Sequence, residues 1–173
     1  RDQPRSRGLG DVYKRQVSRE CSKYGYEPVM LTDQLCCQAK EAGSFLASIA
    51  KTHCKSGKKL AYIAGGETVV NITGHGKGGR NQEIALSAAE GIKGMSNAAV
   101  FSIGSDGTDG PTDAAGGYSD GDTAGVLKNK GIDIFEVLKN NDAYNALKLT
   151  EGLIITGPTG TNVNDVSVLL ISD

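Results

Sequence analysis

Three aspartates follow an apolar stretch in a loop that is rich in glycine. The segment 101–117 reads FSIGSDGTDGPTDAAGG and contains Asp106, Asp109 and Asp113. Carboxylates on such a loop suit Mg²⁺, which takes one or two of them together with phosphate oxygens and water, and an aspartate can also act as a general base toward a hydroxyl group. We therefore predict metal ligation by all three aspartates and catalytic roles for Asp106 and Asp109, with Thr108 and Asp113 also contacting substrate.

These aspartates also allow a purely structural interpretation. Asp-Gly and Pro-Thr-Asp sequences form turns and cap helices, so the loop need not hold any ligand. The spacing does not follow the calcium-binding loop of an EF-hand. Composition alone does not decide between a structural turn and a metal site.

A second loop is glycine-rich and cationic. The segment 74–83 reads GHGKGGRNQE, with a GxGxxG pattern between an expected strand and an expected helix. Bare backbone N–H groups and the positive end of a helix favour anions, and an arginine fork can hold a phosphate or a carboxylate through two hydrogen bonds. The alternative is a glycine-rich turn with surface cations, in which His75 is a solvated loop residue. We predict Arg80 as a catalytic residue and place phosphate or substrate contacts at Gly76, Lys77, Gly78, Gly79 and Asn81.

A third loop is rich in hydroxyl and amide groups. The segment 156–165 reads TGPTGTNVND and lies between two apolar stretches. By itself it is typical of a turn, but its side chains suit a ligand with many oxygen atoms. We predict substrate or phosphate contacts at Thr159 and Asn162, and at Glu67, which follows a strand and two glycines.

The elements that would position these loops alternate between strands and helices. Nearly continuous apolar strands predict an α/β fold with a largely parallel, Rossmann-like sheet and helices on both faces. In such sheets ligands lie beyond the carboxyl ends of the strands, so the three loops are expected to converge on one crevice. We predict strands at 27–32, 60–65, 68–73, 98–104, 152–156 and 166–172, and helices at 34–54 (with Asp33 as N-cap), 80–92, 123–131, 134–140 and 143–150.

Composition and charge argue against a nucleic-acid-binding protein and against a membrane-spanning protein. The 173 residues fit one ordinary domain, and the formal net charge of −1 gives no basic patch for nucleic acid. No apolar stretch reaches the length of about 18 residues that a membrane span needs. The four cysteines form no CxxC pair, so we expect reduced thiols in a cytoplasmic protein.

The first 16 residues differ in character from the rest. RDQPRSRGLGDVYKRQ is basic and lacks the apolar core of a secretory signal. It resembles translated adapter sequence, so we treat 1–16 as a probable non-native leader, with a native basic arm as the alternative. The expected domain is 17–173.

The three loops together resemble the C-terminal (MOFRL) region of the class II glycerate kinases. The matching segments are GGETVVNITGHGKGGRNQEIAL, GSDGTDGPTDAAGGYSDGDT and TGPTGTNVNDV, in that order. The resemblance extends from about residue 25 to the end of the chain. It identifies Arg80 with the functional arginine of the family's GGRNQE motif, whereas the roles given above to the aspartates follow from their chemistry alone.

The resemblance also implies an activity. Family members transfer a phosphoryl group from ATP, with Mg²⁺, to D-glycerate, usually giving 2-phosphoglycerate, in a cleft between two α/β domains. The larger N-terminal domain of the family, with its catalytic lysine, does not precede this segment. We therefore expect a truncated C-terminal portion that is inactive alone and needs that domain as its partner. A homodimer stays open, and neither a nucleic acid nor a membrane is expected as a partner.

Two other functions stay open at this stage. Some relatives are labelled hydroxypyruvate reductase, and a GxGxxG loop also occurs in NAD(P)H-dependent enzymes. A dinucleotide fold would place an acidic residue about 20 positions further on, at a strand end. Glu90 falls inside the expected helix instead, which favours the kinase. The third possibility is a catalytically inactive ligand-binding fragment.

Overall fold

The computed structural model describes the backbone of residues 4–173 and the side chains from Val12 onward. Residues 1–3 of the expected leader lie outside the described residues. The elements follow one another as α1 (Pro4–Lys23), β1 (Glu27–Leu35), α2 (Ala39–His53), β2 (Leu60–Gly66), α3 (Arg80–Gly91), β3 (Ala98–Gly104), β4 (Gly116–Asp120), α4 (Thr123–Asn129), α5 (Ile134–Lys139), α6 (Ala143–Leu149), β5 (Leu153–Ile154) and β6 (Asp165–Ile171).

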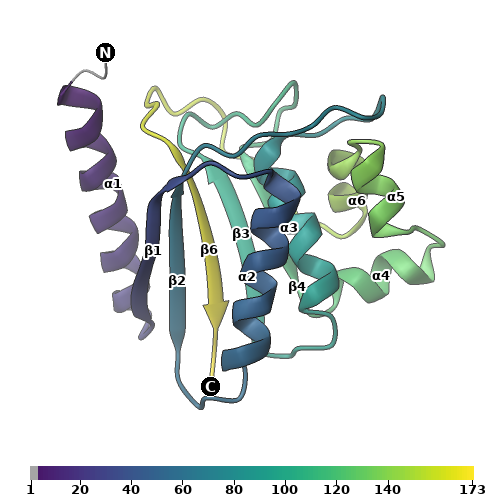
Figure 1. Ribbon diagram of the computed structural model, residues 1–173, viewed down its shortest axis with the longest axis horizontal. Helices are drawn as coiled ribbons and strands as arrows, with labels where there is room; N and C mark the ends of the chain where they lie inside the picture. Colours follow the sequence, from purple (N-terminus) through teal and green to yellow (C-terminus); the bar gives the residue numbers. More distant parts are fainter. Residues whose placement is uncertain (1–3) are drawn as a thin grey trace.

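A mixed sheet forms the centre of the molecule (Figure 1). Its strand order is β1-β2-β6-β3-β4-β5, and helices cover both of its faces. The α/β class is confirmed, but the prediction of a largely parallel sheet was wrong: β1 and β2 pair in parallel, and the other pairs are antiparallel. The apolar run of β6 reflects burial on both faces, which does not depend on strand direction.

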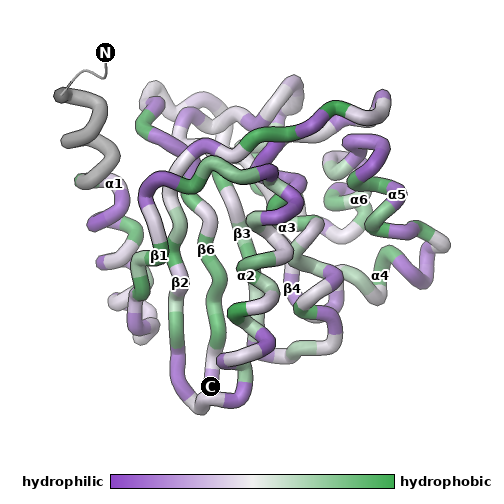
Figure 2. The backbone as a smooth tube through the Cα atoms, in the orientation of Figure 1, coloured by the Kyte–Doolittle hydropathy of each residue, from purple (hydrophilic) through white to green (hydrophobic). Residues whose placement is uncertain are grey.

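The two faces of the sheet bury alternate residues. On β2, Leu60 and Tyr62 pack toward α2 and α3, whereas Ala61 and Ile63 pack in a cluster that includes Val17 of α1. This alternation follows from the two-residue period of a strand. In Figure 2 the central strands β2 and β6 are mainly green or pale, in keeping with their burial. A further cluster joins α3 to α4, α5 and α6 around Leu86, Leu127 and Leu147.

Helices α2 and α3 approach closely through small residues. A Cβ atom added at Gly43 would lie 2.2 Å from the carbonyl oxygen of Ile84. Ala39, Ala42 and Ala88 are buried in the same layer. This tight crossing fixes the position of α3, whose first residue is Arg80.

The segment 68–73 is not a strand, contrary to the prediction. Its contact with the sheet region is one isolated bridge between Val69 and Gln38. Val69 and Ile72 are 55% and 73% exposed. The β-branched residues that favoured a strand have no neighbouring strand to pair with there, so the segment runs as an extended surface strap.

Two other local predictions also need correction. Asp33 lies in β1 and forms an ion pair with Lys14 at 2.9 Å, while α2 begins only after Gln38. No strand was predicted at β4 (Gly116–Asp120), whose two glycines fall in the segment 101–117. Gly116 is required there, since a Cβ atom would lie 1.8 Å from the carbonyl oxygen of Ser102 on β3.

Helix α1 continues without a break through the expected boundary at residue 16. Within the described helices, none combines the length and apolarity required to cross a bilayer.

Candidate functional site

The three polar loops meet at one edge of the sheet, as predicted. Arg80 of the glycine-rich loop pairs with Asp165 at the end of the third loop. The backbone N–H of Thr159 in the third loop donates to the carbonyl oxygen of Asp106 at 3.2 Å. Asp109 of the aspartate loop binds the first turn of α3. The three loops therefore lie together at this edge of the sheet.

Arg80 is the centre of this surface. Its Nε and Nη2 atoms donate to the two carboxylate oxygens of Asp165, and Nη2 also lies 3.0 Å from Oε1 of Glu67. The side chain of Asp165 is 8% exposed, whereas that of Glu67 is 66% exposed. Asp165 is thus a fixed anchor, and Glu67 is a partner that an incoming anion can displace.

The charge of Arg80 is stabilised by its neighbours. The hydrogen bond with Asp165 raises the pKa of the Arg80 guanidinium, against the opposing effect of burial. Since the described residues use Nε and Nη2, the Nη1 end is available to a ligand. An arginine oriented by a buried carboxylate is suited to hold a second anion in a defined position.

A cleft of about 470 Å³ opens beside Arg80. Its walls include Gly78, Gly79, Pro111 and Thr68. The hydroxyl of Thr68 is buried and has no hydrogen-bond partner in the described part of the chain. A cleft with one arginine and glycine walls suits a small, oxygen-rich anion.

Asp109 is a helix cap in this structure. It is 3% exposed, and its carboxylate accepts bonds from the N–H groups of Asn81 (3.0 Å) and Gln82 (2.8 Å) and from the Asn81 side chain (3.1 Å). Burial raises the pKa of Asp109, although these hydrogen bonds oppose the rise. The expected anion site at the N-terminus of α3 is therefore filled by the protein itself.

Asn81 lies inside the protein, although the sequence pointed to a ligand contact. Its side chain is fully buried, and its Oδ1 atom accepts a bond from the Ser102 hydroxyl at 2.6 Å. Ser102 in turn lies 2.7 Å from the hydroxyl of Ser167. Asn81 therefore joins α3 to the sheet and has no surface that could meet a ligand.

The three aspartates do not form a shared metal site in this structure. Asp106 accepts a bond from the N–H of Thr108 within its own turn, and Asp113 accepts one from the hydroxyl of Tyr144 at 2.8 Å. Across the described residues there is no group of three or more His, Cys, Asp or Glu side chains placed to hold a metal. Asp106 and Asp165 both lie near Gly104: a Cβ atom added there would be 3.1 Å from Oδ1 of Asp106 and 3.5 Å from Oδ1 of Asp165.

The glycines of the GxGxxG pattern are required by packing. A Cβ atom at Gly76 would lie 2.4 Å from Cβ of Asp142, and one at Gly79 would lie 2.4 Å from Cγ of Asp109. Several N–H groups of the loop are already bonded to the turn between α5 and α6, such as that of Gly76 to the carbonyl oxygen of Asn140. The N–H groups of residues 74–77 are therefore already used within the protein, and phosphate contacts at Gly78 and Gly79 stay a prediction.

Lys77 points to α6. Its ammonium group lies 4.1 Å from the ring centre of Tyr144, and its backbone N–H donates to Asp142 at 3.0 Å. Tyr144 also holds Asp113. Lys77 and Asp113 thus share a tyrosine, away from the Asp165–Glu67 pairing of Arg80.

The third loop is fastened to the aspartate loop through Ser105. The carbonyl oxygen of Ser105 accepts bonds from the hydroxyls of Thr159 (2.5 Å) and Thr161 (3.3 Å). Asn162 is exposed. Thr159 therefore has a demonstrated structural role, while a ligand contact by Asn162 stays a prediction.

The sequence interpretation missed Asn141, which holds the glycine-rich loop. Its hydrogen-bond partners lie 58 to 70 positions away in the sequence, so no local spacing reveals them. Thr68 was also missed, although it is adjacent to the predicted Glu67.

Known proteins share this arrangement. The chain is 54% identical over 169 residues to the D-glycerate 2-kinase of Thermotoga maritima, covering 94% of this chain and 40% of that protein. The crystal structure of glycerate kinase from Thermotoga maritima matches with a TM-score of 0.84, over 87% of this chain and 37% of that one. A putative hydroxypyruvate reductase of Agrobacterium vitis is 39% identical, over 85% of this chain and 40% of that protein.

The chain therefore spans about 40% of the length of these relatives. Residues 60–165 match the MOFRL family. That range contains Glu67, Arg80 and Asp109 and ends at Asp165, so the matched region is also the region that builds the arginine site. The chain belongs to the MOFRL family.

Proposed function

We propose that this chain is the part of an ATP-dependent glycerate kinase that binds the anionic substrate. The observation that carries the proposal is Arg80, held by Asp165 beside a cleft whose walls include Gly78 and Gly79. The named activity of the Thermotoga maritima relative supports D-glycerate as the acceptor.

Arg80 is the residue that we assign to anion recognition. Its guanidinium binds the carboxylate of D-glycerate or the transferring phosphoryl group, and Asp165 keeps the fork in orientation. Without ligand, the carboxylate of Glu67 pairs with Arg80. A bound anion displaces this carboxylate, because the Glu67 side chain is largely exposed. After this exchange the positive charge of Arg80 is again paired with an anionic group.

These residues can bind Mg²⁺ only if oxygen atoms of the substrate supply further ligands. Asp109 caps α3 and Asp113 is bonded to Tyr144, whereas Asp106 accepts one bond, from the N–H of Thr108 within its own turn. We therefore assign Asp106 as the carboxylate that would hold the ion. One or two carboxylates are enough for Mg²⁺ when phosphate oxygens and water complete its shell. When bound, the ion neutralises charge on the phosphates during transfer.

ATP requires a partner beyond these residues. The N-terminus of α3 is occupied by Asp109, and the N–H groups of residues 74–77 in the glycine-rich loop are bonded to the α5–α6 turn. We propose that a second domain, of the kind that makes up the remaining length of the relatives, holds the nucleotide. A cytoplasmic location is part of the proposal, since Cys21, Cys36, Cys37 and Cys54 are all free thiols.

A chimera tests the proposal. Residues 17–173 replace the matching part of the Thermotoga maritima D-glycerate 2-kinase, and phosphorylation of D-glycerate is measured with ATP and Mg²⁺. We expect turnover in the chimera and none with the 173-residue chain alone, which binds the ligands weakly. A folded chimera that lacks kinase activity but oxidises NAD(P)H on addition of hydroxypyruvate would overturn the proposal in favour of a reductase, and one that does neither would point to a binding module.

A further inference from the structure

Asn141 uses its side-chain hydrogen-bonding groups on the strap and loop that lead to Arg80 and on Glu83 of α3. We propose that Asn141 is a positioning residue, which sets the location of Arg80 for the anionic substrate without touching that substrate. The inference rests on the proposed function, since it names a further residue of the same site.

The amide of Asn141 joins three segments of the chain. Its Oδ1 atom accepts bonds from the N–H groups of Thr73 (2.7 Å) and Gly74 (2.9 Å). Its Nδ2 atom donates to the carbonyl oxygen of Asn71 (3.1 Å) and to Oε1 of Glu83 (3.0 Å). The residue is 7% exposed, so loss of these bonds would leave buried polar groups unpaired.

The backbone at this position favours asparagine. Asn141 has a φ of 55°, a left-handed conformation that asparagine adopts more readily than most residues. The residues on either side hold the same loop: the carbonyl oxygen of Asn140 accepts the N–H of Gly76, and Asp142 accepts that of Lys77. The turn between α5 and α6 thus acts as a template for the glycine-rich loop.

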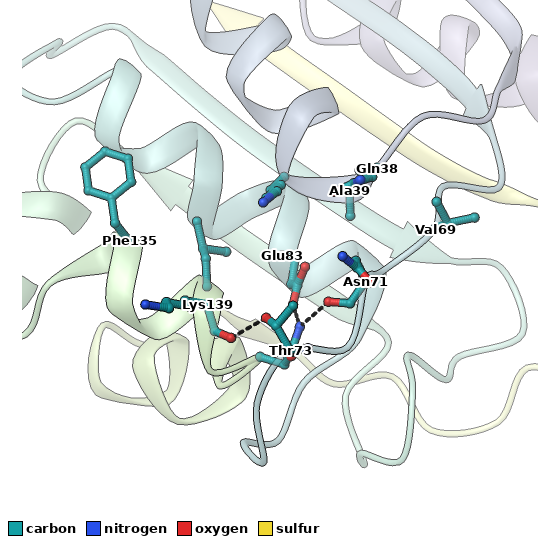
Figure 3. A pocket seen from close by; sticks show the side chains of 11 residues that line it. Gln38, Ala39, Val69, Asn71, Thr73, Glu83, Phe135 and Lys139 are labelled. Atoms are coloured by element: carbon teal, nitrogen blue, oxygen red, sulfur yellow. Dashed lines mark hydrogen bonds between the residues drawn. The ribbon is translucent and has the colours of Figure 1, made fainter.

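The hydrogen bonds of Asn141 act on segments that precede and follow Arg80 in the chain. The loop held by this turn leads directly into α3, whose first residue is Arg80, and Glu83 lies about one turn later on the same helix. Figure 3 labels Asn71, Thr73 and Glu83 around one pocket, and its dashed lines include the bond from the hydroxyl of Thr73 to the carbonyl oxygen of Lys139. A shift of this network therefore moves the start of α3 and the arginine with it.

The chemistry requires an amide at position 141. An aspartate would keep the two acceptor bonds to Thr73 and Gly74 but would place a second carboxylate against Glu83. Two carboxylates in contact cannot both ionise without cost, so one of them takes up a proton. The repulsion therefore weakens as the pH is lowered.

The experiment uses the active chimera with four variants. Asn141→Gly removes the side chain, and glycine adopts the positive φ of this position. Asn141→Asp replaces the N–H donors of the amide and keeps an acceptor oxygen. Asn141→Asp combined with Glu83→Gln places an N–H donor opposite the new carboxylate. Glu151→Gly is the matched control, because Glu151 has a φ of 58° and is exposed. Each protein is assayed for KM, kcat and backbone amide exchange, well below its melting temperature.

We expect Asn141→Gly to raise the KM for D-glycerate about tenfold, the equivalent of about one buried hydrogen bond, with a smaller change in kcat. The N–H groups of Thr73 and Gly74 lose protection from exchange. In Asn141→Asp the rise in KM shrinks as the pH falls from about 8 to about 6, and Glu83→Gln lowers KM again in the double variant. The control keeps the original KM.

The possible outcomes separate this inference from the function on which it rests. A parent chimera without kinase activity would refute the proposed function. An active parent whose Asn141→Gly variant melts at a lower temperature but keeps the KM would show that Asn141 only stabilises the fold, and would overturn the inference alone.

Discussion

At the scale of single residues, burial decides which polar side chains remain available for chemistry. Arg80, Asp109 and Asn81 all come from segments that the sequence marked as functional. Arg80 keeps 37% of its side chain exposed, whereas Asp109 and Asn81 are buried against each other. The sequence could indicate where polar side chains concentrate. Some of them bond to the helix that follows and are then unavailable to a ligand, and their spacing in the sequence does not reveal which ones.

The cap on α3 gives the first prediction. Asp109→Ala leaves buried N–H groups of Asn81 and Gln82 unpaired, so we expect a loss of about 2–4 kcal/mol in the free energy of unfolding. Asp133→Ala is the control, because it removes an exposed cap from α5 and should cost at most about 1 kcal/mol. Urea denaturation measures both, and equal losses would contradict the buried cap.

Glu83 gives a prediction about pH. Burial raises its pKa, although the hydrogen bond from Asn141 opposes the rise. The folded state therefore binds the proton more tightly than the unfolded chain, so this contribution to stability is present at low pH and is lost as the pH rises above about 4.3 and through the raised value. Glu83→Gln should thus gain stability relative to the original chain as the pH rises from about 4 to about 7.

The control for this measurement lies on the same helix. Glu90→Gln changes an exposed glutamate of α3 and should leave the pH profile of unfolding unchanged. A Glu83→Gln profile parallel to that of the original chain would show that the buried carboxyl does not contribute.

At the scale of elements, periodicity located the strongly patterned helices and strands. It predicted α3, β2, β3 and β6 close to their observed bounds, because each buries a regular set of apolar residues. It failed for β4, where glycine is needed for close approach to β3. It also failed for 68–73, where β-branched residues have no strand beside them. Contacts distant in sequence decide both cases.

The crossing of α2 and α3 supplies the element-scale prediction. Gly43→Ala places a Cβ atom against the backbone of Ile84, so we expect a loss of about 1–3 kcal/mol. Gly125→Ala is a matched change on α4, where a Cβ atom meets nothing within 4 Å, and it should gain about 0.5–1 kcal/mol. Thermal unfolding compares the two, and a stabilised Gly43→Ala would refute the tight crossing.

At the scale of the whole molecule, the sequence indicated the α/β class and the convergence of the loops but not the strand directions. A central antiparallel strand with both faces covered has the same apolar pattern as a parallel one. The loops nevertheless meet at one edge, because the strands that they follow, β2, β3 and β5, run in the same direction although they do not pair with one another.

The predicted domain boundary is testable by truncation. We expect residues 17–173 to fold cooperatively, because the packing around α2 and α3 lies entirely within them. The loss should be about 1–3 kcal/mol, from the contacts of Tyr13 with the sheet cluster and the ion pair of Lys14 with Asp33. A truncated chain that does not unfold cooperatively would place the boundary nearer the N-terminus.

The central claim is that Arg80 recognises the anionic substrate of a glycerate kinase. The most direct measurement is kcat/KM for D-glycerate in the active chimera with Arg80→Lys and Arg80→Ala, beside Arg19→Ala on the exposed side of α1. Lysine keeps the charge without the fork, so we predict a loss of about tenfold for Arg80→Lys and about 100-fold or more for Arg80→Ala, with no change for Arg19→Ala. Folded Arg80 variants that retain the full kcat/KM would contradict the claim.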